Sequence, residues 1–259
     1  MDYHIIIPAR YASTRLPGKP LRELAGKSLL QHVYECAKKS QSNSITIATD
    51  DVRIQEAAQA FGADVCLTGQ HHHSGTERAA EVIDKLGISD DAIVVNLQGD
   101  EPLMPADCLD QVARLLVDNP SAPMATLCER IDNLQDIFDP NVVKVVIDQR
   151  GLAMYFSRAS IPWHRNTFND NTSEMPDGQH YYRHIGLYAY RAGFIKSYIQ
   201  AEVCPLEITE SLEQLRVLYM GHSIAIAEAC ADTGPGVDTE ADLKRVDALL
   251  KIRATTDLH

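Results

Sequence analysis

Short apolar runs that alternate with amphipathic helical segments constrain the fold of this chain more than any other feature of its sequence. The runs Tyr3–Ala9, Ser44–Thr49 and Ala92–Leu97 are rich in β-branched residues, as strands are when helices cover both faces of their sheet. The segments between them carry apolar residues at helical spacing, and one begins with the capping box Ser28-x-x-Gln31. This alternation predicts βαβ units, and therefore an α/β fold of three layers with a mostly parallel central sheet.

The pattern changes in the second half of the chain. Three strands are expected with no helix between them, at Val142–Asp148, Leu152–Ser157 and His184–Tyr190. The polar stretch Asn166–Gln179 interrupts them, so we expect a smaller antiparallel lobe at about 150–190, inserted in a single domain that spans residues 1–259. Such a lobe suits a homodimer interface. The remaining expected elements are the helix Pro205–Met220, the strand Ile224–Ala227 and the helix Thr239–Leu250.

The first strand runs directly into a loop, residues 8–20, that gathers three cationic side chains. Open α/β sheets bind their ligands in loops outside the carboxyl ends of their strands. Arg10, Arg15 and Lys19 repel one another unless an anion joins them, which favours a polyphosphate site with the Ser13 hydroxyl nearby. The alternative is a solvated basic loop, which is less favoured because prolines and a Pro-Gly turn stiffen the segment.

Two better-known phosphate-binding loops are excluded by sequence. No Gly-x-Gly-x-x-Gly follows the first strand, so the dinucleotide-binding motif is missing. Gly26-Lys27-Ser28 resembles the end of a P-loop, but Leu21 stands where that motif requires glycine.

Composition narrows the possible partners and the compartment. A net charge of −12 argues against nucleic acid or an anionic membrane as the main partner. Six cysteines are scattered without a Cys-x-x-Cys motif, as is typical of reduced thiols in a cytoplasm. The sequence shows no leader pattern at its start and no apolar stretch of membrane-spanning length. We therefore expect a soluble cytoplasmic protein.

Two acidic residues are candidates for holding a metal ion. Asp100 follows the strand Ala92–Leu97 in an acidic loop, where it can hold Mg²⁺ between the protein and substrate phosphates. The alternative is a helix-capping turn, although Asp107 lies closer to the helix that follows. Asp238 lies in a tight Gly-Pro-Gly segment before the last helix, and spacing leaves both a capping role and a metal-binding role open.

A further anion site is indicated at the helix that begins near Ser74. Free N–H groups at a helix N-terminus attract anions, and Ser74 and Arg78 add a hydroxyl and a guanidinium there. The preceding run 71–73 is all histidine. Neighbouring histidines rarely coordinate one ion together, so this run is expected to be a solvated loop.

Polar side chains of the second half are candidates for binding a sugar. On the helix Pro205–Met220, one stripe contains Ile208, Leu212, Leu215 and Tyr219, and the opposite stripe contains Glu210, Glu213 and Gln214. The polar stripe is either a solvated face or a set of acceptors for sugar hydroxyls. Groups that suit a carboxylated sugar are expected from the lobe: Arg158, His184 and Tyr188. A buried histidine and an interface tyrosine remain the alternatives.

Seven motifs occur in order along nearly the whole chain, at Ile7–Pro20, Ser74–Arg78, Gln98–Pro102, Tyr155–Arg158, Arg183–Tyr188, Leu212–Arg216 and Gly236–Thr239. In this order the chain resembles the 3-deoxy-D-manno-octulosonate (Kdo) cytidylyltransferases, or CMP-Kdo synthetases. The resemblance implies a nucleotidyltransferase fold of GT-A-like type. It also implies transfer of a cytidylyl group from CTP to Kdo by a Mg²⁺-dependent, cytoplasmic homodimer that supplies lipopolysaccharide synthesis.

The resemblance implies a role for each candidate. The residues that neutralise the triphosphate or hold the metal would be Arg10, Arg15, Lys19, Asp100 and Asp238, the last two as Mg²⁺ ligands. Further nucleotide contacts would come from Ser13, Ser74, Arg78 and Gln98. The sugar acid would be bound by Arg158, His184, Tyr188, Glu210, Glu213 and Gln214. The pair Ile208-Thr209 departs from the His-Ile found in some members, and 8-amino-Kdo is an alternative acceptor.

Overall fold

A single large sheet organises the part of the chain that the computed structural model describes, residues 2–12, 16–72, 74–168, 174–178 and 180–256. This sheet has nine strands in the order β11-β7-β10-β6-β1-β4-β5, with β8 paired to β10 and β9 to β8. Its strands are β1 (Tyr3–Pro8), β4 (Ser44–Thr49), β5 (Asp64–Leu67), β6 (Ile93–Asn96), β7 (Met124–Ile131), β8 (Lys144–Ile147), β9 (Ala153–Ser157), β10 (Tyr181–Arg191) and β11 (Ile224–Glu228). A separate hairpin pairs β2 (Glu23–Leu24) with β3 (Lys27–Ser28).

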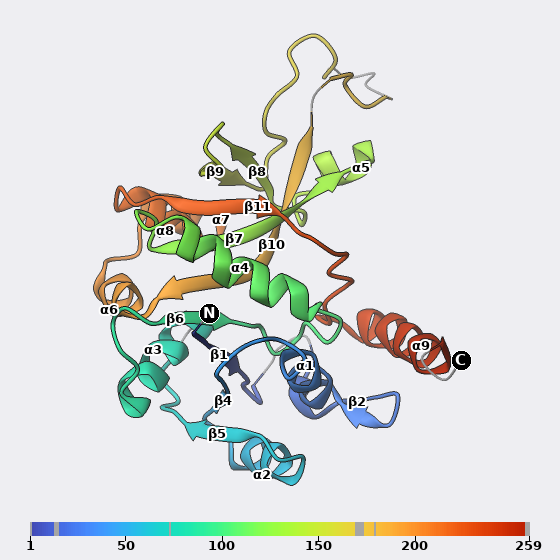
Figure 1. The fold of residues 1–259 in the computed structure, drawn as a ribbon. Helices are drawn as coiled ribbons and strands as arrows, with labels where there is room; N and C mark the ends of the chain where they lie inside the picture. Colours follow the sequence, from blue (N-terminus) through green and yellow to red (C-terminus); the bar gives the residue numbers. More distant parts are fainter. Residues whose placement is uncertain (1, 13–15, 73, 169–173, 179, 257–259) are drawn as a thin grey trace.

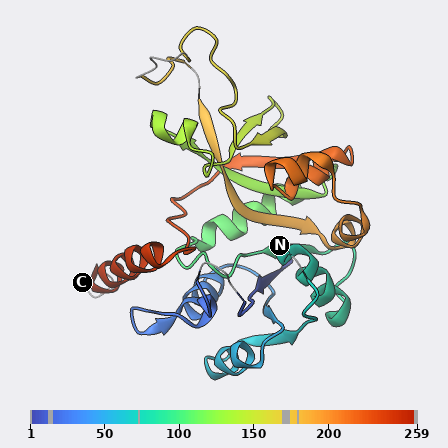
Figure 2. The same ribbon diagram turned by 180° about the vertical axis from the view of Figure 1, so that it is seen from behind.

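Helices cover both faces of the sheet. They are η1 (Lys19–Leu21, a 3-10 turn), α1 (Leu29–Ala37), α2 (Val52–Ala60), α3 (Gly75–Leu86), α4 (Ala106–Asp118), α5 (Leu134–Phe138), α6 (Ala192–Gln200), α7 (Pro205–Glu210), α8 (Gln214–Tyr219) and α9 (Glu240–Thr256). The apolar residues of α1, α2 and α4 pack with Ile5 and Ile7 of β1 in one buried cluster, whereas those of α3, α6 and α8 pack with Ile6 in a second. Figure 1 shows α4 across one face, and Figure 2 shows the α7–α8 segment across the other. The predicted three layers are confirmed.

Strand direction is mostly uniform, as the sequence predicts. β5, β4, β1 and β6 are parallel to one another, and β11 is parallel to β7. β10 is antiparallel to both its neighbours, β6 and β7. Tyr188 of β10 pairs with Asn96 at the carboxyl end of β6, so the first half of β10 extends past the edge where β1 and β6 end. This half lies beside the loops that carry the candidate site.

The region between β7 and β10 is antiparallel. β8 and β9 form a hairpin, and β8 also pairs with β10 at Tyr182 and Arg183. In Figure 1 this hairpin and α5 lie at the end of the molecule away from α2 and β5. The three strands expected here are present. Their status as an inserted dimerisation lobe remains a prediction.

The prediction of one continuous helix over Pro205–Met220 is wrong. Ser211 adopts a left-handed conformation with φ of 53° and separates α7 from α8. The two stripes expected on that helix are therefore wrong as well: Ile208 and Tyr219 are 67% and 61% exposed, whereas Gln214 is 3% exposed. The sequence analysis also missed β5, β7 and α6.

Among the described residues, no helix is both long enough and apolar enough to cross a membrane.

Candidate active site

A cavity of about 300 Å³ opens at the carboxyl ends of β1 and β6. Four segments meet there: the loop after β1, the start of α3, the loop after β6 and the segment before α9. The sequence-predicted residues that line it are Arg10, Lys19, Ser74, Arg78, Gln98, Asp100 and Asp238. The predicted residues Ser13 and Arg15 lie outside the described residues.

Gly99 allows the loop after β6 to approach β1 closely. A Cβ atom at this position would lie 2.8 Å from the carbonyl oxygen of Pro8, which is nearer than real Cβ atoms come. Glycine is therefore required here for the two loops to share one cavity.

Lys19 lies between the two carboxylates predicted to hold a metal ion. Its ammonium donates to Asp100 Oδ2 at 2.6 Å and to Asp238 Oδ1 at 3.0 Å, and also to the carbonyl oxygen of Val237 at 3.0 Å. Burial acts to lower the pKa of Lys19, but the charges and hydrogen bonds of the two aspartates outweigh it and raise that pKa. The three side chains therefore form one ionic cluster.

Packing explains how Asp238 reaches a lysine more than two hundred residues away in the sequence. Its neighbour Val237 is buried in an apolar cluster with Leu16 and Leu103. The Val237 N–H also donates to the carbonyl oxygen of Asp100 at 2.9 Å, which ties the two acidic loops together.

Glu101 is a third acid beside this cluster, and the sequence analysis gave it no role. Burial, with the charge of Asp100 added, raises the pKa of Glu101 to about 8. The only signal in the sequence was its place next to Asp100 in an acidic loop.

Ser74 and Arg78 have structural duties in addition to lining the cavity. The Ser74 hydroxyl accepts from the N–H of Glu77 at 3.1 Å and so caps α3. Arg78 is 3% exposed and donates to the Thr68 hydroxyl and to the carbonyl oxygen of Gly69. It also lies 3.5 Å from Asp50, so a buried cation is fixed at the floor of the cavity.

His184 and Asp238 line a second cavity, of about 630 Å³, next to the first. The Thr126 hydroxyl lies within 3.0 Å of the carbonyl oxygens of Ile185 and Leu187, and it lies 3.0 Å from His184 Nε2. Because the hydroxyl has a single proton to donate to a carbonyl, Nε2 is the donor in its contact with His184. Burial lowers the pKa of His184 to about 3, so the ring is neutral and Nδ1 is left as an acceptor.

Tyr188, Glu213 and Gln214 lie in the buried region next to α3 and α6. Glu213 Oε1 accepts from the Thr76 hydroxyl at 3.0 Å, and burial raises the pKa of Glu213. Gln214 Nε2 and both side-chain polar atoms of Asn96 are buried without a hydrogen-bond partner among the described residues. Buried polar groups are rarely left unpaired, but neither Asn96 nor Gln214 lines the two cavities described above, so a ligand-binding role for Gln214 remains a prediction.

Arg158 and Glu210 form a separate unit with each other. Glu210 accepts from the Ser157 hydroxyl at 2.6 Å and from the Arg158 N–H at 2.9 Å. The Arg158 guanidinium donates to the carbonyl oxygens of Glu210 and Pro140. These bonds join β9 to α7, and a sugar-binding role for either residue remains a prediction.

Comparisons with known proteins identify the family of this chain. The family model described as cytidylyltransferase matches residues 4–224. Two relatives, from Pseudomonas fluorescens and Hahella chejuensis, are 54% and 52% identical; each alignment covers 96% of this chain, with 98% and 97% of the relative, and both are named 3-deoxy-manno-octulosonate cytidylyltransferase. The chain belongs to the 3-deoxy-manno-octulosonate cytidylyltransferase family.

Two solved structures share the fold of this chain. One described as CMP:2-keto-3-deoxy-manno-octonic acid synthetase complexed with CTP is 42% identical, with a TM-score of 0.89 over 97% of this chain and 99% of that one. A cytidylyltransferase from Leptospira borgpetersenii is 16% identical, with a TM-score of 0.62 over 97% of this chain and 87% of that one, and it shows likeness of fold alone.

Proposed function

We propose that this chain transfers a cytidylyl group from CTP to Kdo and releases pyrophosphate. The observation that carries the proposal is the cluster of Lys19, Asp100 and Asp238 at a cavity that Arg10 and Arg78 also line. A site of this kind suits a polyanion accompanied by a metal ion. The names of the full-length relatives supply the nucleotide and the sugar acid.

The triphosphate is proposed to bind along the loop after β1 and at the start of α3. Its charge would be neutralised by Arg10, Arg15 and Lys19, and further contacts would come from Ser13, Ser74, Arg78 and Gln98. Because the buried Arg78 and the capped start of α3 are fixed before substrate arrives, little side-chain entropy is lost on binding.

Mg²⁺ is proposed as the cofactor, with Asp100 and Asp238 as its ligands. The donor set fits, because carboxylate oxygens are the ligands that Mg²⁺ prefers and both carboxylates already share one cation, the Lys19 ammonium. When bound, the ion would neutralise phosphate charge and orient the substrate groups.

The sugar acid is proposed to bind toward the first half of β10. The neutral His184 would accept a hydrogen bond from a sugar hydroxyl, and Tyr188, Glu213 and Gln214 would contact the remaining hydroxyls. Arg158 and Glu210 are retained in the proposed set, although their present bonds to each other must open for direct contact. Catalysis would depend on positioning and charge neutralisation, with no protein general base.

The wider setting is also a proposal: a cytoplasmic homodimer that supplies lipopolysaccharide synthesis. The dimer would form through the antiparallel region, where Trp163 and Met154 are 59% and 62% exposed. Six free cysteines suit a reducing compartment.

The test is pyrophosphate release from CTP, Mg²⁺ and Kdo, compared with 8-amino-Kdo and N-acetylneuraminate. We expect turnover that requires Kdo and CTP, and turnover without Kdo, or with GTP or UTP preferred, would refute the proposal. Asp100→Asn and Asp238→Asn should each abolish turnover in a folded protein. Asp107→Asn, an exposed acid at the start of α4, is the matched control that retains it.

A further inference from the structure

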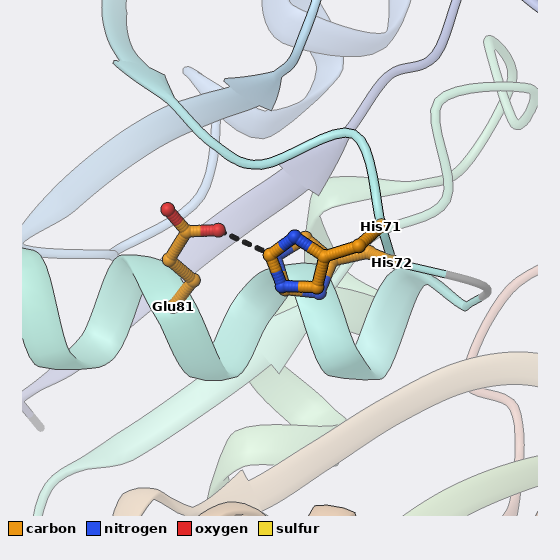
Figure 3. A group of neighbouring side chains, drawn as sticks. All are labelled: His71, His72 and Glu81. Atoms are coloured by element: carbon orange, nitrogen blue, oxygen red, sulfur yellow. Dashed lines mark hydrogen bonds and ion pairs between the residues drawn. The ribbon is translucent and has the colours of Figure 1, made fainter.

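Two histidines and a glutamate come together beside α3, and one of them, His72, also lines the cavity that contains the two aspartates. His71 and His72 precede this helix, and Glu81 lies in its second half. Each offers one ligand atom, and these atoms all lie within 4.8 Å of one another. Figure 3 shows both imidazole rings facing the Glu81 carboxylate.

His71 and His72 lie in a loop, as expected, and His71 is exposed, but their side chains do not diverge. Their ring centroids are 4.2 Å apart. The reason is that the Glu81 carboxylate fixes His72, and the His71 ring packs on it and over Gly69. A Cβ atom at Gly69 would lie 2.3 Å from the His71 ring, so only glycine leaves room for this arrangement.

Neighbouring groups fix the orientation of the Glu81 carboxylate. Its Oε2 accepts from the N–H of Gly69 at 2.8 Å and from His72 Nε2, and its Oε1 lies 2.8 Å from the Lys85 ammonium. Such contacts are the kind that orient a carboxylate around a metal ion. The side chain of His72 is only 9% exposed, whereas His71 is open to solvent, so an ion could enter from the His71 side.

We propose that His71, His72 and Glu81 bind a Zn²⁺-class ion, with a ligand set that does not include the two aspartates. Two imidazole nitrogens and one carboxylate oxygen are typical ligands of Zn²⁺ and related first-row ions, and a water would complete the tetrahedron. Mg²⁺ prefers oxygen ligands alone, so the two sites differ in metal class. Binding would replace the hydrogen bond between His72 and Glu81 by two metal bonds.

Calorimetric titration of the untagged, chelator-treated protein with Zn²⁺ tests this, with saturating Mg²⁺ present to occupy the aspartates. We expect one Zn²⁺ per chain, and Co²⁺ should give an absorption spectrum without a thiolate charge-transfer band. His71→Ala and Glu81→Gln should each weaken binding at least tenfold. His222→Ala, an exposed histidine outside the cluster, should not.

Three results would overturn the proposal. The first is the absence of Zn²⁺ binding once Mg²⁺ is saturating. The second is unchanged affinity in both His71→Ala and Glu81→Gln while circular dichroism shows them folded. The third is loss of binding in Cys230→Ser, which would move the ion to the exposed thiol.

Discussion

Replacing Lys19 with methionine should strengthen Mg²⁺ binding in the absence of nucleotide while it abolishes turnover. In the nucleotide-free protein the ammonium occupies both carboxylates, so an incoming ion must displace it. A hydrogen bond between charged groups contributes about 1.5–3 kcal/mol. Because Asp238 is 49% exposed, we count only the 2.6 Å bond to Asp100. The expected gain is therefore roughly 10- to 100-fold in Kd.

Calorimetric titration with Mg²⁺ would measure this change, with pyrophosphate release measured in parallel. Methionine keeps the length of the side chain and removes its charge. Lys27→Met is the matched control. Lys27 lies on the surface hairpin and pairs with Glu35 of α1, so its loss should alter neither quantity. Unchanged or weaker Mg²⁺ binding by a folded Lys19→Met protein would refute the view that ammonium and metal share the carboxylates.

Two further predictions concern stability. Gly99→Ala should lower the free energy of unfolding, measured in urea, by about 1–3 kcal/mol, because the new Cβ would lie 2.8 Å from the Pro8 carbonyl oxygen. The control Gly186→Ala has open space around it and should lower the free energy of unfolding by less. Equal losses of stability in the two variants would contradict this reasoning. Burial lowers the pKa of His184 to about 3, so its contribution to stability is full above about pH 6.5 and is lost as pH falls toward 3. Its loss should contribute at most about 1.4 kcal/mol per pH unit. In His184→Gln the decline across this window should be shallower, and a parallel decline would show that another group governs it.

Much of the site could be predicted from the sequence because parallel strands deliver their carboxyl ends to one edge. Arg10 and Asp100 follow β1 and β6, so their place in one cavity could be predicted without knowing how side chains pack. Asp238 is different. The approach of Asp238 depends on the burial of Val237 and on the hydrogen bond from the Val237 N–H to the Asp100 carbonyl oxygen, and neither is visible in the sequence spacing. The family resemblance, rather than the local pattern, placed it there.

The broken helix shows where periodicity fails. Residues 205–220 have helical spacing and contain no proline or glycine between Leu206 and Met220, yet Ser211 turns left-handed. The break directs Glu210 toward Ser157, whereas Glu213 contacts Thr76. Tertiary contacts such as the buried Leu212 outweigh local preference here, because a few tenths of a kcal/mol of propensity per residue cannot oppose them. Glu210 and Glu213, expected on one face of a single helix, therefore lie in two different parts of the structure.

The ionic cluster also bears on the order in which substrates bind. With Lys19 between Asp100 and Asp238, the ammonium balances one of the two carboxylate charges before any ligand arrives. A metal ion alone must displace the ammonium into a cavity that already contains Arg10 and Arg78, which is unfavourable. If a triphosphate enters as well, the ammonium gains a new anionic partner and the carboxylates are released to the ion. Metal and nucleotide should therefore each strengthen the binding of the other by the same factor, as linkage requires. That mutual strengthening should be smaller in Lys19→Met, because exchange of the ammonium between carboxylates and phosphates no longer contributes to it.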